Sequence, residues 1–136
     1  MHQDHRPRII IVEDDDDART CFAEALALAP ALGQAVDITK AASCAEARDA
    51  AEEARDRLAL VLLDRRLPDG DGLDFTAEVH RRWPRATVIL LTADSSPHTA
   101  ASSRRLGVPR LLVKPVRLDE LTSCVTTALA SSGHLG

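Results

Sequence analysis

Short, uninterrupted apolar runs alternate with Ala-rich segments of helical periodicity, and this alternation constrains the fold more than any other feature of the sequence. Runs such as Ile9-Ile10-Ile11-Val12 are apolar at every position, which is typical of strands covered on both faces. The segments between them repeat apolar residues every three or four positions, as helices do. Strands are expected at 8–13, 35–40, 59–63, 87–92 and 110–113, and helices at 16–29, from 43 onward, and at 73–82, 96–106 and 118–130.

Strands and helices that alternate in this way form a parallel sheet with short, right-handed crossovers. A chain of 136 residues is long enough for one α/β domain with a sizeable core. Only 2% of the residues are aromatic, so we expect a core of Leu, Val, Ile and Ala. The domain is expected to span 8–130, with a flexible N-terminus at 1–7 and a flexible tail, or a truncated linker, at 131–136.

Composition and charge argue against several classes of function. The formal net charge of −4 and the scarcity of aromatic side chains disfavour nucleic-acid binding by this chain alone. No apolar run approaches the roughly 20 residues that cross a bilayer, and the N-terminus does not resemble a signal peptide. The three cysteines, Cys21, Cys44 and Cys124, are widely spaced and are expected to be buried free thiols. We therefore expect a cytoplasmic protein without membrane contact.

Polar side chains follow four of the expected strands at the point where each strand ends. Glu13 and Asp14 end the first strand, Asp64 the third, Thr92 the fourth and Lys114 the fifth. Ligands of open parallel sheets bind outside the carboxyl ends of the strands, where these groups converge. Clustered carboxylates repel each other unless a cation offsets their charge, and an all-oxygen ligand set favours Mg²⁺. A carboxylate beside such an ion is a possible nucleophile for phosphoryl transfer, with a lysine and a threonine suited to holding the phosphoryl oxygens.

Each of these residues also has a purely structural interpretation. Asp16 and Asp17 fit a solvated helix N-terminus, where acidic groups favour the helix dipole. A lone Asp64 after a buried strand could cap a turn, and Thr92 or Lys114 alone would carry little information. The functional interpretation depends on their joint occurrence, each at the end of a different expected strand.

The order and spacing of four segments resemble the receiver domains of bacterial response regulators in two-component signalling, including the chemotaxis regulators. The segments are 9–15 (IIIVEDD), 60–72 (LVLLDRRLPDGDG), 88–93 (VILLTA) and 111–115 (LLVKP). The resemblance covers roughly residues 8 to 130. It implies a flavodoxin-like (βα)5 fold, a doubly wound parallel sheet with strand order 2-1-3-4-5.

The resemblance also implies a magnesium site. Asp64 takes the place of the phosphoacceptor, and Asp14 that of a direct ligand of Mg²⁺ or Mn²⁺. Glu13 would act on the ion through water, and the backbone carbonyl of Arg66 would be the remaining protein ligand.

The same resemblance assigns the residues that respond to phosphorylation. Thr92 matches the switch hydroxyl that moves toward the phosphoryl group, and Lys114 the ammonium that pairs with it. Pro115 is expected to follow a cis peptide bond.

Two positions depart from the family pattern. Leu111 stands where the family usually has Tyr or Phe, so the usual aromatic rotamer switch cannot operate. Val108-Pro109-Arg110 replaces a stretch that is acidic in many DNA-binding regulators, which puts the dimer formed by that face in doubt. We further hypothesise that Arg66 and Asp94, each two residues beyond an active-site residue, contact each other and tune the lifetime of the phosphoryl group.

Three classes of function are compatible with these residues. The first is a phosphotransfer module that receives a phosphoryl group from a histidine kinase or a histidine phosphotransfer protein and then acts on a downstream protein. Such a module catalyses only its own phosphorylation and dephosphorylation. The second is a degenerate receiver that binds partners independently of phosphorylation. The third, a Mg²⁺-dependent phosphohydrolase, usually needs a second Asp two residues after the nucleophile, where this chain has Arg66.

Overall fold

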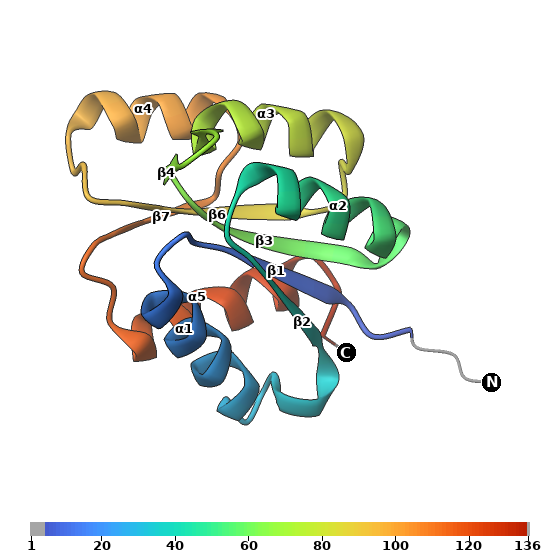
Figure 1. The fold of residues 1–136 in the computed structure, drawn as a ribbon. Coiled ribbons are helices and arrows are strands. Elements are labelled where there is room, and N and C mark those ends of the chain that lie inside the picture. Colours follow the sequence, from blue (N-terminus) through green and yellow to red (C-terminus); the bar gives the residue numbers. More distant parts are fainter. Residues whose placement is uncertain (1–4, 136) are drawn as a thin grey trace.

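A five-stranded parallel sheet forms the centre of the protein in the computed structural model, which describes residues 5–135 (Figure 1). The strands lie in the order β2-β1-β3-β6-β7, which is the expected flavodoxin-like order with a short extra hairpin between the third and fourth long strands. Their bounds are β1 Arg8–Val12, β2 Asp37–Ala41, β3 Leu58–Asp64, β6 Thr87–Thr92 and β7 Arg110–Val113.

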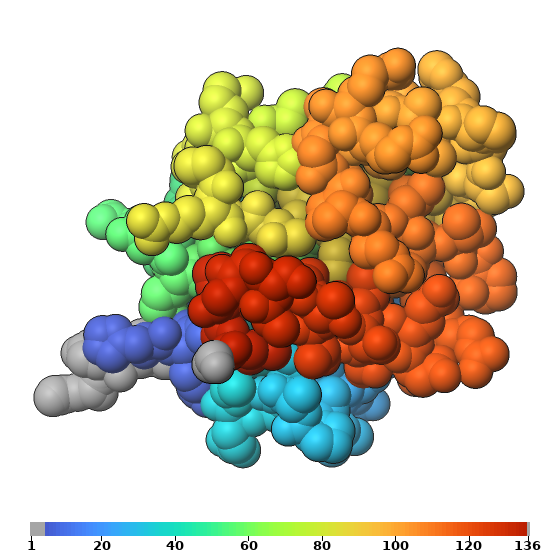
Figure 2. Space-filling model, turned by 180° about the vertical axis from the view of Figure 1, so that it is seen from behind, coloured from blue at the N-terminus to red at the C-terminus, as the bar shows by residue number. Residues whose placement is uncertain are grey.

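Helices cover both faces of this sheet. The chain returns after β1 and after β7 on one face, and after β2, β3 and β6 on the other (Figure 1). One face carries α1 (Asp16–Leu28) and α5 (Leu118–Ser131), and the other carries α2 (Cys44–Ala54), α3 (Gly72–Arg82) and α4 (Pro97–Arg105). Seen from behind, α5 crosses the middle of the molecule between α4 and the segment that follows α1 (Figure 2).

The core is aliphatic, as the composition predicts, and the sheet divides it into two layers. All seven residues of β3 are buried, which explains why its sequence is apolar without alternation. Ile9, Ile11 and Leu62 face α1 and α5, whereas Ile10 and Leu63 face α2 and α3. This division follows from the two-residue period of a strand.

Local signals place most helix starts correctly. Ser43 caps α2 and Ser96 caps α4, each accepting a hydrogen bond from a backbone N–H three residues later. Two expectations need correction. The second strand begins at Asp37 rather than at residue 35, because Gly33–Ala35 form a 3-10 turn. Cys21 is exposed, not buried, because Phe22 and Leu26 occupy the core side of α1.

The ends of the described chain pack onto the domain. The Arg6 guanidinium lies 2.8 Å from the Asp37 carboxylate, and Leu135 packs against the core layer beneath α5. Residues 1–4 of the expected flexible N-terminus and residue 136 of the expected tail lie outside the described residues. Among residues 5–135, no helix combines the length and apolar character that a bilayer-spanning helix needs.

Candidate functional site

The ends of β1, β3 and β7 bring two buried carboxylates and one ammonium together. Lys114 Nζ donates to Asp64 Oδ2 at 3.0 Å and to Glu13 Oε1 at 3.2 Å. Glu13 and Asp64 are only 2% and 5% exposed, so their charges interact in a poorly solvated environment. Lys114 comes from a position 101 residues beyond Glu13, which the parallel topology alone explains.

Asp14 completes an acidic cluster at this edge. Carboxylate oxygens of Glu13, Asp14 and Asp64 lie within 4.8 Å of one another, and Asp14 is exposed. Three carboxylates and one ammonium leave two negative charges, which suits one divalent cation. The donors are all oxygen, which favours a hard ion such as Mg²⁺ over a transition metal. The residues present therefore fit the metal that the sequence predicts.

The site raises the pKa of Glu13 and the pKa of Lys114 for different reasons. Burial raises the pKa of Glu13, assisted by the charge of Asp64, and outweighs the opposing effects of the Asp15 N–H and Lys114. Burial alone would lower the pKa of Lys114, but its hydrogen bond to Asp64 and the charges of both carboxylates raise it. Lys114 therefore stays an ammonium at neutral pH, while Glu13 is harder to keep charged than a solvated glutamate.

Thr92 ends β6 close to this group and is 3% exposed. Its hydroxyl oxygen accepts a hydrogen bond from the Asp94 N–H at 3.0 Å, and its carbonyl accepts one from the Lys114 N–H at 2.7 Å. The Thr92 hydroxyl thus holds the start of the loop that leads to α4.

The loop after Asp64 folds back as a small antiparallel hairpin, which the sequence did not predict. Its strands are β4 (Arg66–Leu67) and β5 (Gly70–Asp71). A Cβ at Gly72 would lie 2.7 Å from the Asp64 carbonyl oxygen, so only glycine permits this close return of the chain. At the tip of the hairpin, the Asp69 carboxylate accepts from the Cys44 and Ala45 N–H groups at 2.8 and 2.9 Å. The hairpin is therefore fixed to both Asp64 and α2.

Arg65 carries the contact that we expected of Arg66. Arg65 Nη1 donates to Asp94 Oδ2 at 3.2 Å and to Thr99 Oγ1 at 2.7 Å, and Thr99 Oγ1 donates to the same carboxylate oxygen at 2.6 Å. Arg66 is exposed, and its N–H lies 3.4 Å from Asp64 Oδ1. The expected Arg66–Asp94 contact is therefore wrong, because the chain turns the side chain of Arg65 toward α4.

This network has a marked effect on Asp94. Hydrogen bonds from the Thr99 hydroxyl and from Ser96, together with the charge of Arg65, lower the pKa of Asp94 to about 2. Thr99 is 1% exposed and lies in the first turn of α4. Arg65, the residue after Asp64, thus links the end of β3 to the loop after Thr92 and to α4.

The remaining predicted residues lie on or beside β7. The Lys114–Pro115 peptide bond is cis, as expected. Leu111 is half-buried and packs against the core layer that contains α2 and α3. The expected loss of an aromatic switch at this position stays a prediction.

Comparison with known proteins gives one consistent family. Residues 9–126 match the family model of the response regulator receiver domain. The response regulator protein PilR of Pseudomonas aeruginosa is 38% identical over 125 residues, which are 91% of this chain and 26% of PilR. The regulatory protein AtoC of Escherichia coli is 35% identical over 90% of this chain and 25% of its own length. The chain thus spans about a quarter of these curated relatives.

Solved structures show the same fold. A signal receiver domain of a putative LuxO repressor from Vibrio parahaemolyticus superposes with a TM-score of 0.79, at 26% identity over 93% of this chain and 92% of its own. A CheY-like receiver domain from Methanospirillum hungatei has a TM-score of 0.80 at 24% identity, over 96% of this chain and 99% of its own.

Proposed function

The chain belongs to the response regulator receiver domain family, and on that premise we propose that it accepts a phosphoryl group on Asp64. The observation that carries the proposal is the Lys114 ammonium 3.0 Å from the buried Asp64 carboxylate, inside a cluster that retains two negative charges. Such a carboxylate is held in place beside a cation, as a nucleophile requires.

The reaction is a transfer between two side chains of different proteins. An Asp64 oxygen attacks the phosphorus of a phosphohistidine, an O–P bond forms while the N–P bond breaks, and the released imidazole takes up a proton from solvent. The Lys114 ammonium offsets the charge of the phosphoryl oxygens, and the Thr92 hydroxyl donates to one of them. The protein acts on itself and is not a turnover enzyme.

Asp14, Asp64 and the backbone carbonyl of Arg66 would hold Mg²⁺ or Mn²⁺ in this proposal. Glu13, the most buried of the three clustered carboxylates, would act on the ion through water. When bound, the ion offsets the negative charge that accumulates between the carboxylates and the phosphoryl group.

The structural response begins at Thr92. If its hydroxyl turns toward the phosphoryl group, the Asp94 N–H loses its partner at 3.0 Å, and Asp94 is held by Arg65 and Thr99. The change then passes to α4 through these polar contacts, in place of an aromatic side chain at Leu111. Arg66 and Asp94, which do not contact each other, each lie two residues beyond an active-site residue and remain our candidates for setting the phosphoryl lifetime.

The proposed donor is a histidine kinase or a histidine phosphotransfer protein in the cytoplasm, and the receiver of the signal is a protein. PilR and LuxO are described as regulatory proteins, which supports a signalling role for this chain. The net charge of −4 argues against direct nucleic-acid contact.

Intact-mass measurement after incubation with Mg²⁺ and acetyl phosphate tests the proposal. We expect one phosphoryl adduct on the wild type and none on Asp64→Asn or when Mg²⁺ is replaced by EDTA. An adduct that survives Asp64→Asn, or that forms equally well in EDTA, would contradict the assigned chemistry.

Leu111 favours one alternative, a receiver that binds its partner regardless of phosphorylation. This alternative predicts that Mg²⁺ with beryllofluoride leaves the amide NMR spectrum of α4 and β7 unchanged. Shifts at Asp94, Thr99 and Leu111 would instead support the phosphorylation-dependent module.

A further inference from the structure

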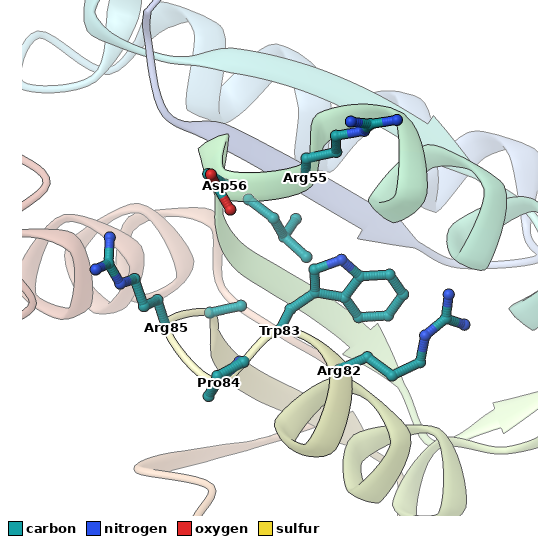
Figure 3. A pocket seen from close by; sticks show the side chains of 8 residues that line it. Arg55, Asp56, Arg82, Trp83, Pro84 and Arg85 are labelled. Carbon is teal, nitrogen blue, oxygen red and sulfur yellow. The ribbon is translucent and has the colours of Figure 1, made fainter.

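A polar cavity lies at the amino end of the sheet, remote from Asp64. Its volume is about 270 Å³, and it opens between the loops that enter β3 and β6 (Figure 3). Leu58 at its wall and Asp64 are the first and last residues of β3. At ~3.3 Å per residue, the cavity and the carboxylate cluster lie at opposite ends of the strand. The lining residues are Arg55, Asp56, Leu58, Arg82, Trp83, Pro84, Arg85 and Ala86.

Trp83 lines this cavity, and Arg82 holds its ring in place from one side. The Arg82 guanidinium carbon is 4.4 Å from the centroid of the Trp83 ring. Arg82 is itself fixed by Glu52 at 2.6 Å and Glu78 at 3.0 Å, so its charge is already compensated. The indole is therefore a preorganised aromatic surface, half-exposed, with a neutralised cation behind it.

Two other arginines of the cavity carry uncompensated charge. The side chains of Arg55 and Arg85 are exposed and make no hydrogen bond or ion pair within residues 5–135. Figure 3 shows them on different loops, with the Trp83 ring between those loops. Asp56 also lines the cavity, so these three side chains together carry a net charge of +1 in a chain whose net charge is −4.

The backbone at Arg55, which lines the cavity, is unusual. Arg55 follows α2 with φ of +53° and ψ of −123°, a conformation with positive φ that favours glycine. A residue with a side chain is strained there. This strained position places an arginine in the lining of the cavity.

We propose that this cavity docks an acidic peptide segment of a partner protein. An apolar side chain of the peptide packs on Trp83 and against Leu58, and carboxylates on either side of it meet Arg55 and Arg85. A nucleic acid fits less well, because a continuous polyanion would extend beyond Arg55 and Arg85 over the surface of a chain whose net charge is −4. This docking surface does not depend on phosphorylation of Asp64.

The fluorescence of Trp83 reports on this cavity, because the chain has one Trp and no Tyr. The test titrates the wild type with the blocked peptide acetyl-Glu-Glu-Leu-Glu-Glu-amide and follows Trp emission at low and high salt. We expect a saturable change that weakens as salt rises, since exposed charge pairs are screened. The matched peptide with Gln at each Glu position should bind at least about fivefold more weakly.

Variants then localise the binding. Arg55→Gln with Arg85→Gln should weaken the acidic peptide about fivefold to tenfold, whereas Arg104→Gln with Arg105→Gln, an equal charge change on α4, should have little effect. Thermal unfolding verifies that both double variants fold. The proposal is overturned if no saturable change occurs, if the Gln peptide binds equally well, or if the α4 variant weakens binding as much as the cavity variant.

Discussion

The two ends of the sheet use charge in opposite ways. At the carboxyl end, Glu13 and Asp64 are buried and paired with Lys114, within a short hydrogen-bonded network. At the amino end, Arg55 and Arg85 are exposed and unpaired within the described residues. Buried charges act strongly on a reacting group, whereas exposed ones mainly attract and orient a partner. The two ends thus differ in burial as well as in position, with a shielded site for the proposed phosphoryl transfer and an exposed one for the proposed docking.

The carboxyl end should be intolerant of added volume. A Cβ on Gly72 would lie 2.7 Å from the Asp64 carbonyl oxygen and 2.8 Å from Arg65 Cα, both backbone atoms. Gly72→Ala is therefore expected to lower stability by about 3 kcal/mol and to abolish phosphorylation, because the loop must move away from Asp64. Urea unfolding and intact-mass analysis measure the two effects.

Gly70→Ala is the matched control in the same hairpin, since its Cβ would meet only Cys44 Sγ at 3.5 Å. Equal effects of the two substitutions would show that the close return at Gly72 is not what shapes the site.

Removal of one cation from each end of the sheet should lower stability by different amounts. Lys114→Met leaves the buried carboxylates of Glu13 and Asp64 without their ammonium and is expected to cost about 2 kcal/mol at pH 7. Arg85→Met should stay within about 0.5 kcal/mol of the wild type. Denaturant titrations of both variants measure the free energy of unfolding. A larger loss of stability for Arg85→Met than for Lys114→Met would contradict the contrast between the two ends.

An ion-pair chain with a defined pH dependence joins α2 to α3 beside the Trp83 cavity. Arg48 donates to both Glu78 oxygens, at 2.7 and 2.8 Å, and lowers the pKa of Glu78 to about 2. Because this pKa lies below the ordinary 4.5, the stabilisation is complete above about pH 4.5 and is lost as pH falls toward 2. Glu78→Gln should therefore cost about 1 kcal/mol at pH 7, and the difference from wild type should shrink at acidic pH.

Glu24→Gln, on an exposed position of α1, provides the control for a neutralised carboxylate. A Glu78→Gln deficit that is independent of pH between 7 and 3 would contradict the ion-pair explanation.

The smallest expected effect concerns the reactivity of the cysteines rather than the stability of the fold. Burial, with the nearby charge of Asp69, raises the pKa of Cys44 to about 11, and burial also raises the pKa of Cys124. In the native state at pH 8, iodoacetamide should therefore alkylate the exposed Cys21 alone. Mass spectrometry should find one adduct in buffer and three in denaturant. Rapid native alkylation of Cys44 would show that the α2 N-terminus beside the hairpin opens.

The sequence predicted those parts of the molecule that local patterns determine. The strand bounds of β6 and β7 and the Ser43 and Ser96 caps match, because periodicity and capping chemistry depend on a few neighbouring residues. The convergence of strand ends on Asp64 was predictable from parallel topology.

What could not be predicted depends on long-range geometry. Neighbouring arginines, Arg65 and Arg66, point in different directions, and only the path of the hairpin decides which one meets Asp94. Cys21 lies beside the apolar stripe of α1, and the exact rotation of that helix leaves it exposed. The Trp83 cavity joins two loops about 30 residues apart in sequence, and no local pattern indicates it.

The central claim is that Asp64, among three clustered carboxylates, receives the phosphoryl group. Borohydride reduction of the phosphorylated protein, followed by peptide mapping, converts an aspartyl phosphate to homoserine and identifies its position. We predict homoserine at position 64 alone, dependent on Mg²⁺ during phosphorylation. Homoserine at position 14, or a phosphorylated protein without homoserine at any position, would contradict the account.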